Sequence, residues 1–173
     1  GAVRTVALVD EDGRAAGVPW VSTAERIVIV WPAGDGYLAA DIEPDHVRIT
    51  PGTNMIGEPR DTVVADLGAF EGIPVAADLV AQLRLKAALV RSIQVCAALD
   101  RALELSIKHT TSREQFGRPL SKFQSVQHLI SDIAAEAALA RSATEAALST
   151  AGARDWSAPL LASLVAAART CAG

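Results

Sequence analysis

The sequence predicts an α+β protein in which a partial antiparallel β-domain is followed by an antiparallel helical bundle. Two observations predict this fold class. Short runs of β-branched residues, bounded by Gly, Pro and Asp, fill residues 1–70, and this pattern is typical of strands joined by turns. From about Ala76 the apolar residues recur every three to four positions, which is the period of a helix. We therefore expect two domains, residues 1–70 and residues 76–173.

Five strands are expected in the β-half, and they cover Thr5–Val9, Ile27–Trp31, Tyr37–Ile42, Val47–Thr50 and Thr62–Leu67. Five strands are few for a closed barrel, and a free sheet edge exposes unpaired backbone groups. We therefore expect part of this sheet to lie upstream of Gly1. The segment Asp10-Glu11-Asp12-Gly13 resembles a calcium loop only superficially, because an EF-hand needs ligands at alternating positions over twelve residues. A hairpin turn is favoured there.

Three helices are expected in the second half, covering roughly Asp78–Lys108, Lys122–Ser149, and a third segment that begins at Asp155 or Ser157 and continues to Cys171. The first is apolar on most sides, which is typical of a buried bundle member. Ser121 and Gln124 form a capping-box pattern, which places the start of the second helix at Ser121. Gly152 is expected to end that helix. Three helices joined by short loops predict an antiparallel bundle.

Composition narrows the classes of partner. Half of the residues are hydrophobic and the net charge is −4, so neither nucleic acid nor an anionic membrane is expected as a partner. No apolar run is long enough to cross a bilayer. Cys96 and Cys171 lie inside helical patterns and are expected to be reduced thiols of a cytoplasmic protein. The three histidines show no metal-ligand spacing, so no metal site is expected.

The segment between the first two helices carries side chains that a plain connection does not need. Arg113 precedes the start of the second helix, whose free N–H groups and positive dipole end favour an anion such as a diphosphate. Gln115 can donate or accept a hydrogen bond. Phe116 and Phe123 offer flat apolar surface for a ring system. The alternative is a loop with a solvated arginine and two phenylalanines that fill the end of the bundle.

The continuous run from Arg113 to His128 resembles the signature of the acyl-CoA dehydrogenase family, flavoenzymes that desaturate acyl-CoA thioesters. Thr53–Val64 looks like the final strands of the family's middle β-domain. The segment from Val18 to Trp20, with Ala24–Val28 after it, looks like an earlier strand of that domain. The resemblance implies the end of the middle β-domain followed by three of the four C-terminal helices.

The same resemblance implies a cofactor site for FAD that is shared between subunits. Arg113 and Gln115 would contact the FAD diphosphate of a neighbouring subunit. Phe116, Phe123 and Gln124 would line the adenosine side of the cofactor. The implied substrate is an acyl-CoA, and the implied assembly is a homo- or hetero-oligomer, as a dimer or tetramer.

No catalytic residue is assigned. In most family members the glutamate that removes the α-proton follows a Gly-Gly motif on a fourth helix, and in others it lies on the first helix. The corresponding positions here, Leu85 to Ala88, are not acidic. We therefore expect the 173 residues alone to be inactive and the full-length form to be the enzyme. One alternative is a non-catalytic helical subunit that completes a partner's FAD site and oligomer core, and another is a helical scaffold without a cofactor.

Overall fold

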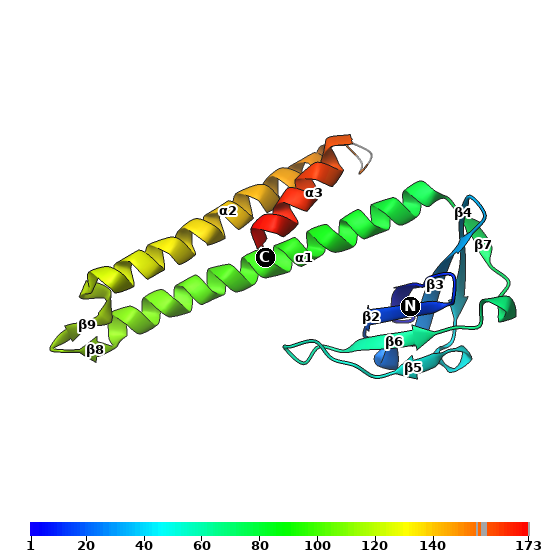
Figure 1. The fold of residues 1–173 in the computed structure, drawn as a ribbon, viewed down its shortest axis with the longest axis horizontal. Helices are drawn as coiled ribbons and strands as arrows, with labels where there is room; N and C mark the ends of the chain where they lie inside the picture. The colour runs from blue at the N-terminus through cyan, green and yellow to red at the C-terminus, as the bar shows by residue number, and fades with distance from the viewer. Residues whose placement is uncertain (155, 157–158, 173) are drawn as a thin grey trace. The chain divides into compact units, whose positions relative to one another are not determined.

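The computed structural model describes residues 1–154, 156 and 159–172, and it divides the chain into two compact units, residues 1–80 and 81–173. Strands fill the first unit and three helices fill the second (Figure 1). The predicted α+β class is confirmed. Each unit is described by itself below.

Two sheets form the first unit. The four-stranded sheet has the order β1-β3-β4-β7, with β1 at Arg4–Leu8, β3 at Arg26–Ala33, β4 at Gly36–Ile42 and β7 at Ile73–Val75. The three-stranded sheet has the order β2-β6-β5, with β2 at Arg14–Pro19, β6 at Arg60–Val64 and β5 at Arg48–Thr50. Short 3-10 turns cover Val21–Thr23, Pro44–His46 and Leu67–Ala69.

All five strands expected from β-branched runs are present, although their ends differ. Two further strands did not follow from that pattern: β2, of which the resemblance indicated only Val18 and Pro19, and β7. Strand β2 is rich in Ala and contains Gly17 and Pro19, and β7 has only three residues, one of them Pro74. Neither sequence has the β-branched character on which the prediction relied. One pair departs from the expected antiparallel arrangement, because β1 and β3 are parallel. The chain enters the second sheet through β2 before it returns to β3, so no hairpin joins β1 to β3.

A tight turn at Asp10–Gly13 carries the chain from one sheet to the other. The Gly13 N–H donates to the Asp10 carbonyl at 3.0 Å, and the Asp10 carboxylate accepts from the N–H groups of Asp12 and Arg14. Gly13 has a φ of 73°, and any Cβ there would collide with the Ala65 carbonyl. The predicted turn is therefore confirmed, but the two strands that it joins belong to different sheets.

A buried carboxylate, that of Asp61, links separate segments of the first unit. The side chain is 1% exposed and lies beside a core that includes Ile27, Ile29 and Val63. Its two oxygens accept from the Ser22 N–H at 2.9 Å and the Gly52 N–H at 3.1 Å. Burial raises the pKa of this carboxyl, but the hydrogen bonds outweigh burial and hold the pKa below its ordinary value.

The Asp61→Asn variant should lower the free energy of unfolding of the first unit by about 1–3 kcal/mol, because an amide nitrogen would face a buried N–H donor. A carboxyl whose pKa is lowered on folding stabilises the folded state at pH values above the ordinary aspartate pKa. This contribution is lost as the pH falls through the folded-state pKa. Urea unfolding should therefore separate wild type from the variant at pH 7, and the difference should shrink below about pH 4. Asp45→Asn, at a side chain 79% exposed, is the matched control. Equal effects of the two substitutions would contradict this role.

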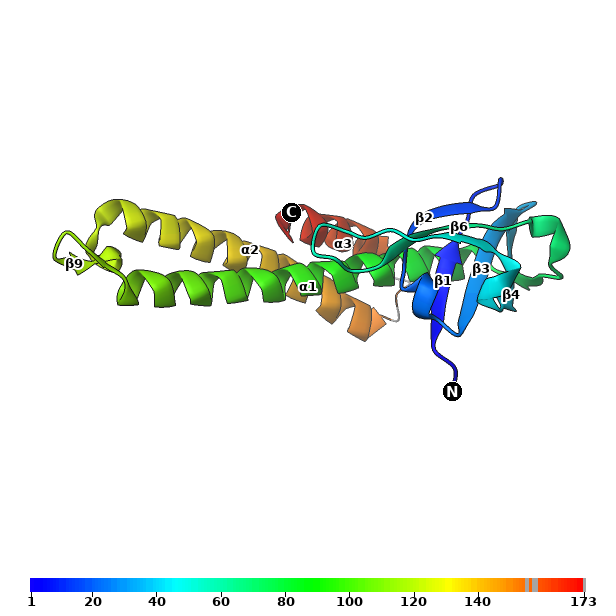
Figure 2. The same cartoon turned by 90° about the horizontal axis from the view of Figure 1, so that it is seen from below.

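Three helices form the second unit: α1 at Ala77–Ser112, whose first turn belongs to the first unit, α2 at Gln124–Arg154 and α3 at Pro159–Ala172 (Figures 1 and 2). The predicted capping box is wrong, because Ser121 lies in a 3-10 turn at Leu120–Lys122 and α2 begins at Gln124. The prediction that Gly152 ends the helix is also wrong, since α2 continues to Arg154. The predicted starts of the third helix, Asp155 and Ser157, lie outside the described residues.

Small side chains let α2 and α3 pack closely, and α1 contributes a leucine to the same core. Leu89 of α1, Ala147 and Ala151 of α2, and Leu161, Val165 and Ala168 of α3 form a single buried cluster. Cys96 and Thr144 meet beside it, with 3.4 Å between Sγ and Oγ1. Val126, Ile130 and Ile133, nearer the start of α2, are only half-buried. The prediction that α1 is buried on most sides is wrong in this structure, where Val90, Leu105 and Ile107 are exposed.

Leu161→Ala should lower the free energy of unfolding of the helical unit by about 2–5 kcal/mol, the usual cost of removing a fully buried leucine side chain. Leu160→Ala, at the neighbouring residue that is 60% exposed, should change it by less than about 1 kcal/mol. Chemical denaturation followed by circular dichroism measures both values. A larger loss for Leu160→Ala would contradict the observed orientation of α3.

Candidate functional site

A short β-hairpin connects α1 to α2 at one end of the helical unit (Figure 1). Its strands are β8, Glu114–Gln115, and β9, Arg118–Pro119, which pair antiparallel. The backbone of Arg113 holds the base of the hairpin: its N–H donates to the His109 carbonyl of α1, and its carbonyl accepts from the Leu120 N–H, both at 2.9 Å. The Arg113 side chain therefore extends from a fixed backbone.

The tip of the hairpin is a two-residue turn made by Phe116 and Gly117. Their φ angles are 54° and 76°, and positive φ at both positions is what a type I′ turn requires. Glycine adopts this conformation readily, whereas a bulky L-residue is strained in it. Phe116 is nevertheless 92% exposed, so core packing does not explain a phenylalanine here. A strained and exposed aromatic side chain makes the tip a candidate for binding.

The side chains of Phe116 and Arg118 both contact the ring of Phe123. The rings of Phe116 and Phe123 meet edge to face, with centroids 6.3 Å apart and planes at 74°. The guanidinium carbon of Arg118 lies 4.1 Å from the centroid of the Phe123 ring. The structure thus brings the two predicted phenylalanines together and adds Arg118, which the sequence analysis did not single out. Arg118 directly follows the Phe116-Gly117 turn and pairs with Gln115 across it. This position beside a predicted site residue is the signal that could have identified it.

The polar residues predicted for the site lie on the surface. Arg113, Gln115 and Gln124 are all exposed, and within the described residues the Arg113 guanidinium forms neither a hydrogen bond nor an ion pair. Gln124 is the first residue of α2. The first N–H groups of a helix have no carbonyl partner inside it, and no described side chain caps those of α2. An unpaired cation and free N–H donors therefore occur in one short segment, and this donor set suits an anion.

The first unit contributes a separate candidate residue, Trp20, which the sequence analysis did not assign to a site. It follows β2, has a φ of 58° and is 52% exposed. The 3-10 turn at Val21–Thr23 after it is fixed by the Ser22 N–H bond to the buried Asp61. An indole held in a strained conformation at the surface can stack on a planar ligand. The signal in the sequence was a tryptophan directly after Pro19 at the end of a run of small residues.

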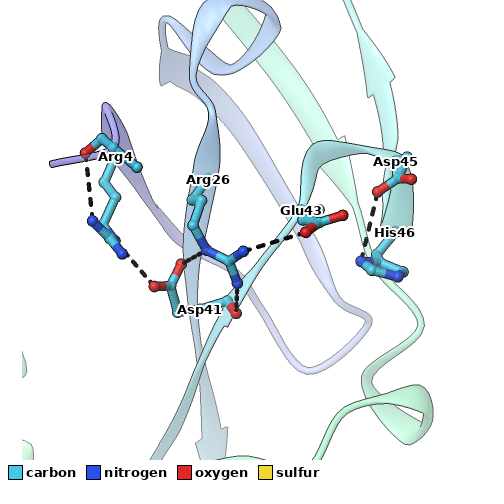
Figure 3. Close-up of polar contacts among 7 residues, drawn as sticks. Arg4, Arg26, Asp41, Glu43, Asp45 and His46 are labelled. Atoms are coloured by element: carbon cyan, nitrogen blue, oxygen red, sulfur yellow. Dashed lines mark hydrogen bonds and ion pairs between the residues drawn. The ribbon is translucent and has the colours of Figure 1, made fainter.

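Arg26, Asp41 and Glu43 also line an open groove of about 650 Å³ in the first unit, but these three side chains take part in one network of ion pairs (Figure 3). The Asp41 carboxylate accepts from Arg26 Nε at 2.8 Å and from Arg4 Nε at 3.0 Å, and Arg26 Nη1 lies 3.5 Å from Glu43. The bond from Arg26 lowers the pKa of Asp41 more than burial raises it, and Arg4 lowers it further. This network joins β1, β3 and β4, so we interpret it as structural.

Neither a metal site nor a membrane span was found in the part of the chain that the structure describes. Among those residues, no three His, Cys, Asp or Glu side chains form a group that could hold a metal ion. None of the described helices combines the length and the apolar character that crossing a bilayer requires. The described cysteines are both free thiols, with Cys96 buried and Cys171 half-buried.

Comparison with known proteins identifies a matching family and relatives by sequence. A profile of the family described as acyl-CoA dehydrogenase, C-terminal domain, matches residues 71–171. The chain is 33% identical over 64 residues to the acyl-CoA dehydrogenase IpdE2 of Mycolicibacterium smegmatis. These aligned residues cover 37% of this chain and 21% of that protein. It is 29% identical over 106 residues to the probable acyl-CoA dehydrogenase YngJ of Bacillus subtilis, covering 61% and 24% respectively. The chain thus spans about a quarter or less of the length of these relatives.

Solved structures share the fold. One chain of the ChsE4-ChsE5 complex from Mycobacterium tuberculosis matches with a TM-score of 0.80 and 18% identity, over 99% of this chain and 48% of that one. The glutaryl-coenzyme A dehydrogenase glutaryl-CoA complex matches with a TM-score of 0.78 and 19% identity, again over 99% and 48%. At this level of identity the likeness shows the fold alone, and it spans about half of each neighbour.

The strain at Phe116 is open to a direct test. Phe116→Asn should give a higher free energy of unfolding than Phe116→Leu, by about 0.5–1 kcal/mol, because asparagine tolerates positive φ and leucine does not. Both variants remove the ring, so the difference between them reports the backbone alone. Urea unfolding at one pH measures it. Equal stability of the two variants would show that the turn does not hold Phe116 at positive φ.

Proposed function

Since the chain belongs to the acyl-CoA dehydrogenase family, we propose that it is part of an FAD-dependent enzyme that catalyses α,β-desaturation of an acyl-CoA thioester. The observation that carries this proposal is the exposed hairpin between α1 and α2, which lies inside the matched region 71–171. In this proposal residues 1–70 form the end of the family's middle β-domain. Residues 76–173 form its C-terminal helical bundle up to the last helix.

The residues of the hairpin suit the chemistry of FAD. Arg113, Gln115 and the free N–H groups of α2 would hold the diphosphate, since charge-assisted hydrogen bonds and helix N-termini favour such anions. Phe116, Phe123 and Gln124 would line the adenosine side. FAD, when bound, supplies the acceptor for the hydride that leaves the β-carbon of the thioester.

Desaturation also needs a base that takes the α-proton, so that proton and hydride leave together and an enoyl-CoA remains. Helix α1 offers no acid between Leu85 and Ala88. Lys86, within that stretch, lies over the Trp156 ring, with 5.1 Å from Nζ to the ring centroid. We therefore place the base outside these 173 residues, and we expect the chain alone to leave acyl-CoA unoxidised. Proton transfer by a positioned base contributes about 10²–10⁴-fold to rates of this kind.

Assembly into a dimer or tetramer belongs to the same proposal. The hairpin is exposed, and near it α1 and α2 leave open apolar grooves of about 250 and 460 Å³, lined in part by Ile107, Val126 and Ile130. Monomers rarely expose large apolar patches, so a further helix or another subunit would cover these grooves. The two free thiols favour a cytoplasmic location.

Arg113→Ala should reduce FAD retention by the whole gene product that carries this chain. The expected loss is about 1.5–3 kcal/mol, the scale of a charge-assisted hydrogen bond. The measurement is the flavin absorbance that remains after extensive dialysis, together with the dissociation constant for added FAD. Arg101→Ala is the control, since that exposed arginine of α1 pairs with Glu104. Unchanged flavin content in Arg113→Ala would contradict the assignment, and absence of flavin binding in the wild type would favour a scaffold without cofactor.

A further inference from the structure

We propose that Arg118 is a positioning residue of the cofactor site. It acts through the Phe123 ring to hold the tip of the hairpin in the shape that presents Phe116. This inference rests on the proposed function, because its consequence is measured as FAD affinity. It assigns different roles to the two arginines of the hairpin: Arg113 supplies charge to the ligand, and Arg118 supplies rigidity to the segment.

The geometry around Arg118 supports this division. Its guanidinium carbon lies 4.1 Å from the Phe123 ring centroid, which is well within the range of a cation–π contact. Arg118 is exposed, and no carboxylate in the described residues pairs with it. The aromatic face is therefore its main partner within this unit. Arg113, in contrast, has no stacking partner in the described residues and stays open to an incoming anion.

The tip of the hairpin needs such a contact because, beyond the backbone hydrogen bonds of Arg113 at the base, little else holds it. Two residue pairs, Glu114 with Pro119 and Gln115 with Arg118, make up its ladder, and an isolated two-stranded hairpin is marginally stable at best. The strained Phe116 at the tip persists only where the surroundings fix it. Phe123 directly precedes α2 and touches both Phe116 and Arg118. Contacts with this ring therefore connect the tip of the hairpin and β9 to the start of α2.

Loss of this contact should weaken FAD binding because a looser hairpin loses more conformational entropy when FAD binds. The effect should not come from the loss of a positive charge that contacts the ligand. An exposed cation–π contact contributes roughly 0.5–1 kcal/mol, so Arg118→Met should raise the dissociation constant for FAD about two- to five-fold. Arg118→Lys keeps the charge but loses the planar group, and it should recover part of the affinity. Lys122→Met removes a nearby exposed charge and should have a smaller effect than Arg118→Met.

The deciding experiment is a double-mutant cycle on the whole gene product, with Arg118→Met, Phe123→Leu and the double variant titrated with FAD. If Arg118 acts through Phe123, the effect of Arg118→Met vanishes in the Phe123→Leu background. The same loss in both backgrounds would mean that Arg118 contacts the cofactor directly, and it would overturn the proposal. No effect of Arg118→Met in the wild-type background would overturn it as well.

A second readout does not depend on flavin. In the apo protein the Phe123 ring current should shift the side-chain protons of Arg118 upfield in the NMR spectrum, and Phe123→Leu should abolish the shift. Unshifted protons would refute the stack and with it this inference, whatever the cofactor. A shifted Arg118 in a protein that binds no FAD would instead refute the proposed function and leave the stack intact. Thermal stability should change little in Arg118→Met, because the residue is exposed.

Discussion

The turn between α1 and α2 is the constraint on which the candidate site depends. Two long helices must be joined through residues 113–123, and the backbone of Arg113 bonds to the end of α1 and to Leu120 across the base of a hairpin. This closure leaves the start of α2 uncapped by any described side chain and forces Phe116 into positive φ. It also keeps the Arg113 side chain at the surface. The features that suit an anionic, ring-bearing ligand therefore follow from how the connection is made.

The sequence predicted the elements of regular pattern well. Apolar periodicity located the three helices, and β-branched runs located five strands, because burial on one face leaves a readable signal. The misses have identifiable causes. Strand β2 is built from Ala, Gly and Pro, and β7 has only three residues, so neither carries that signal. The capping pattern at Ser121 failed because a 3-10 turn at Leu120–Lys122 precedes the helix.

The candidate site was predicted in part. The hairpin segment and its five residues were named from the resemblance, and the structure shows how Phe116 and Phe123 meet. The sequence offered weak signals for Arg118 and Trp20, but the contact between Arg118 and Phe123 and the exposure of Trp20 depend on backbone angles and packing. Asp61 is a similar case in the first unit: its role requires that Ser22 and Gly52, far apart in the chain, approach one carboxylate. Family membership therefore rests on the comparisons, while the roles of single residues rest on geometry.

The central claim is that the hairpin contacts FAD in an assembled enzyme. The most direct measurement is an experimental structure of the whole gene product with FAD bound. We predict that the Arg113 guanidinium lies within hydrogen-bond distance of the FAD diphosphate of a neighbouring subunit, with Phe116 against the adenosine side. A structure in which the hairpin lies in solvent, away from every other chain and from the cofactor, would contradict this account.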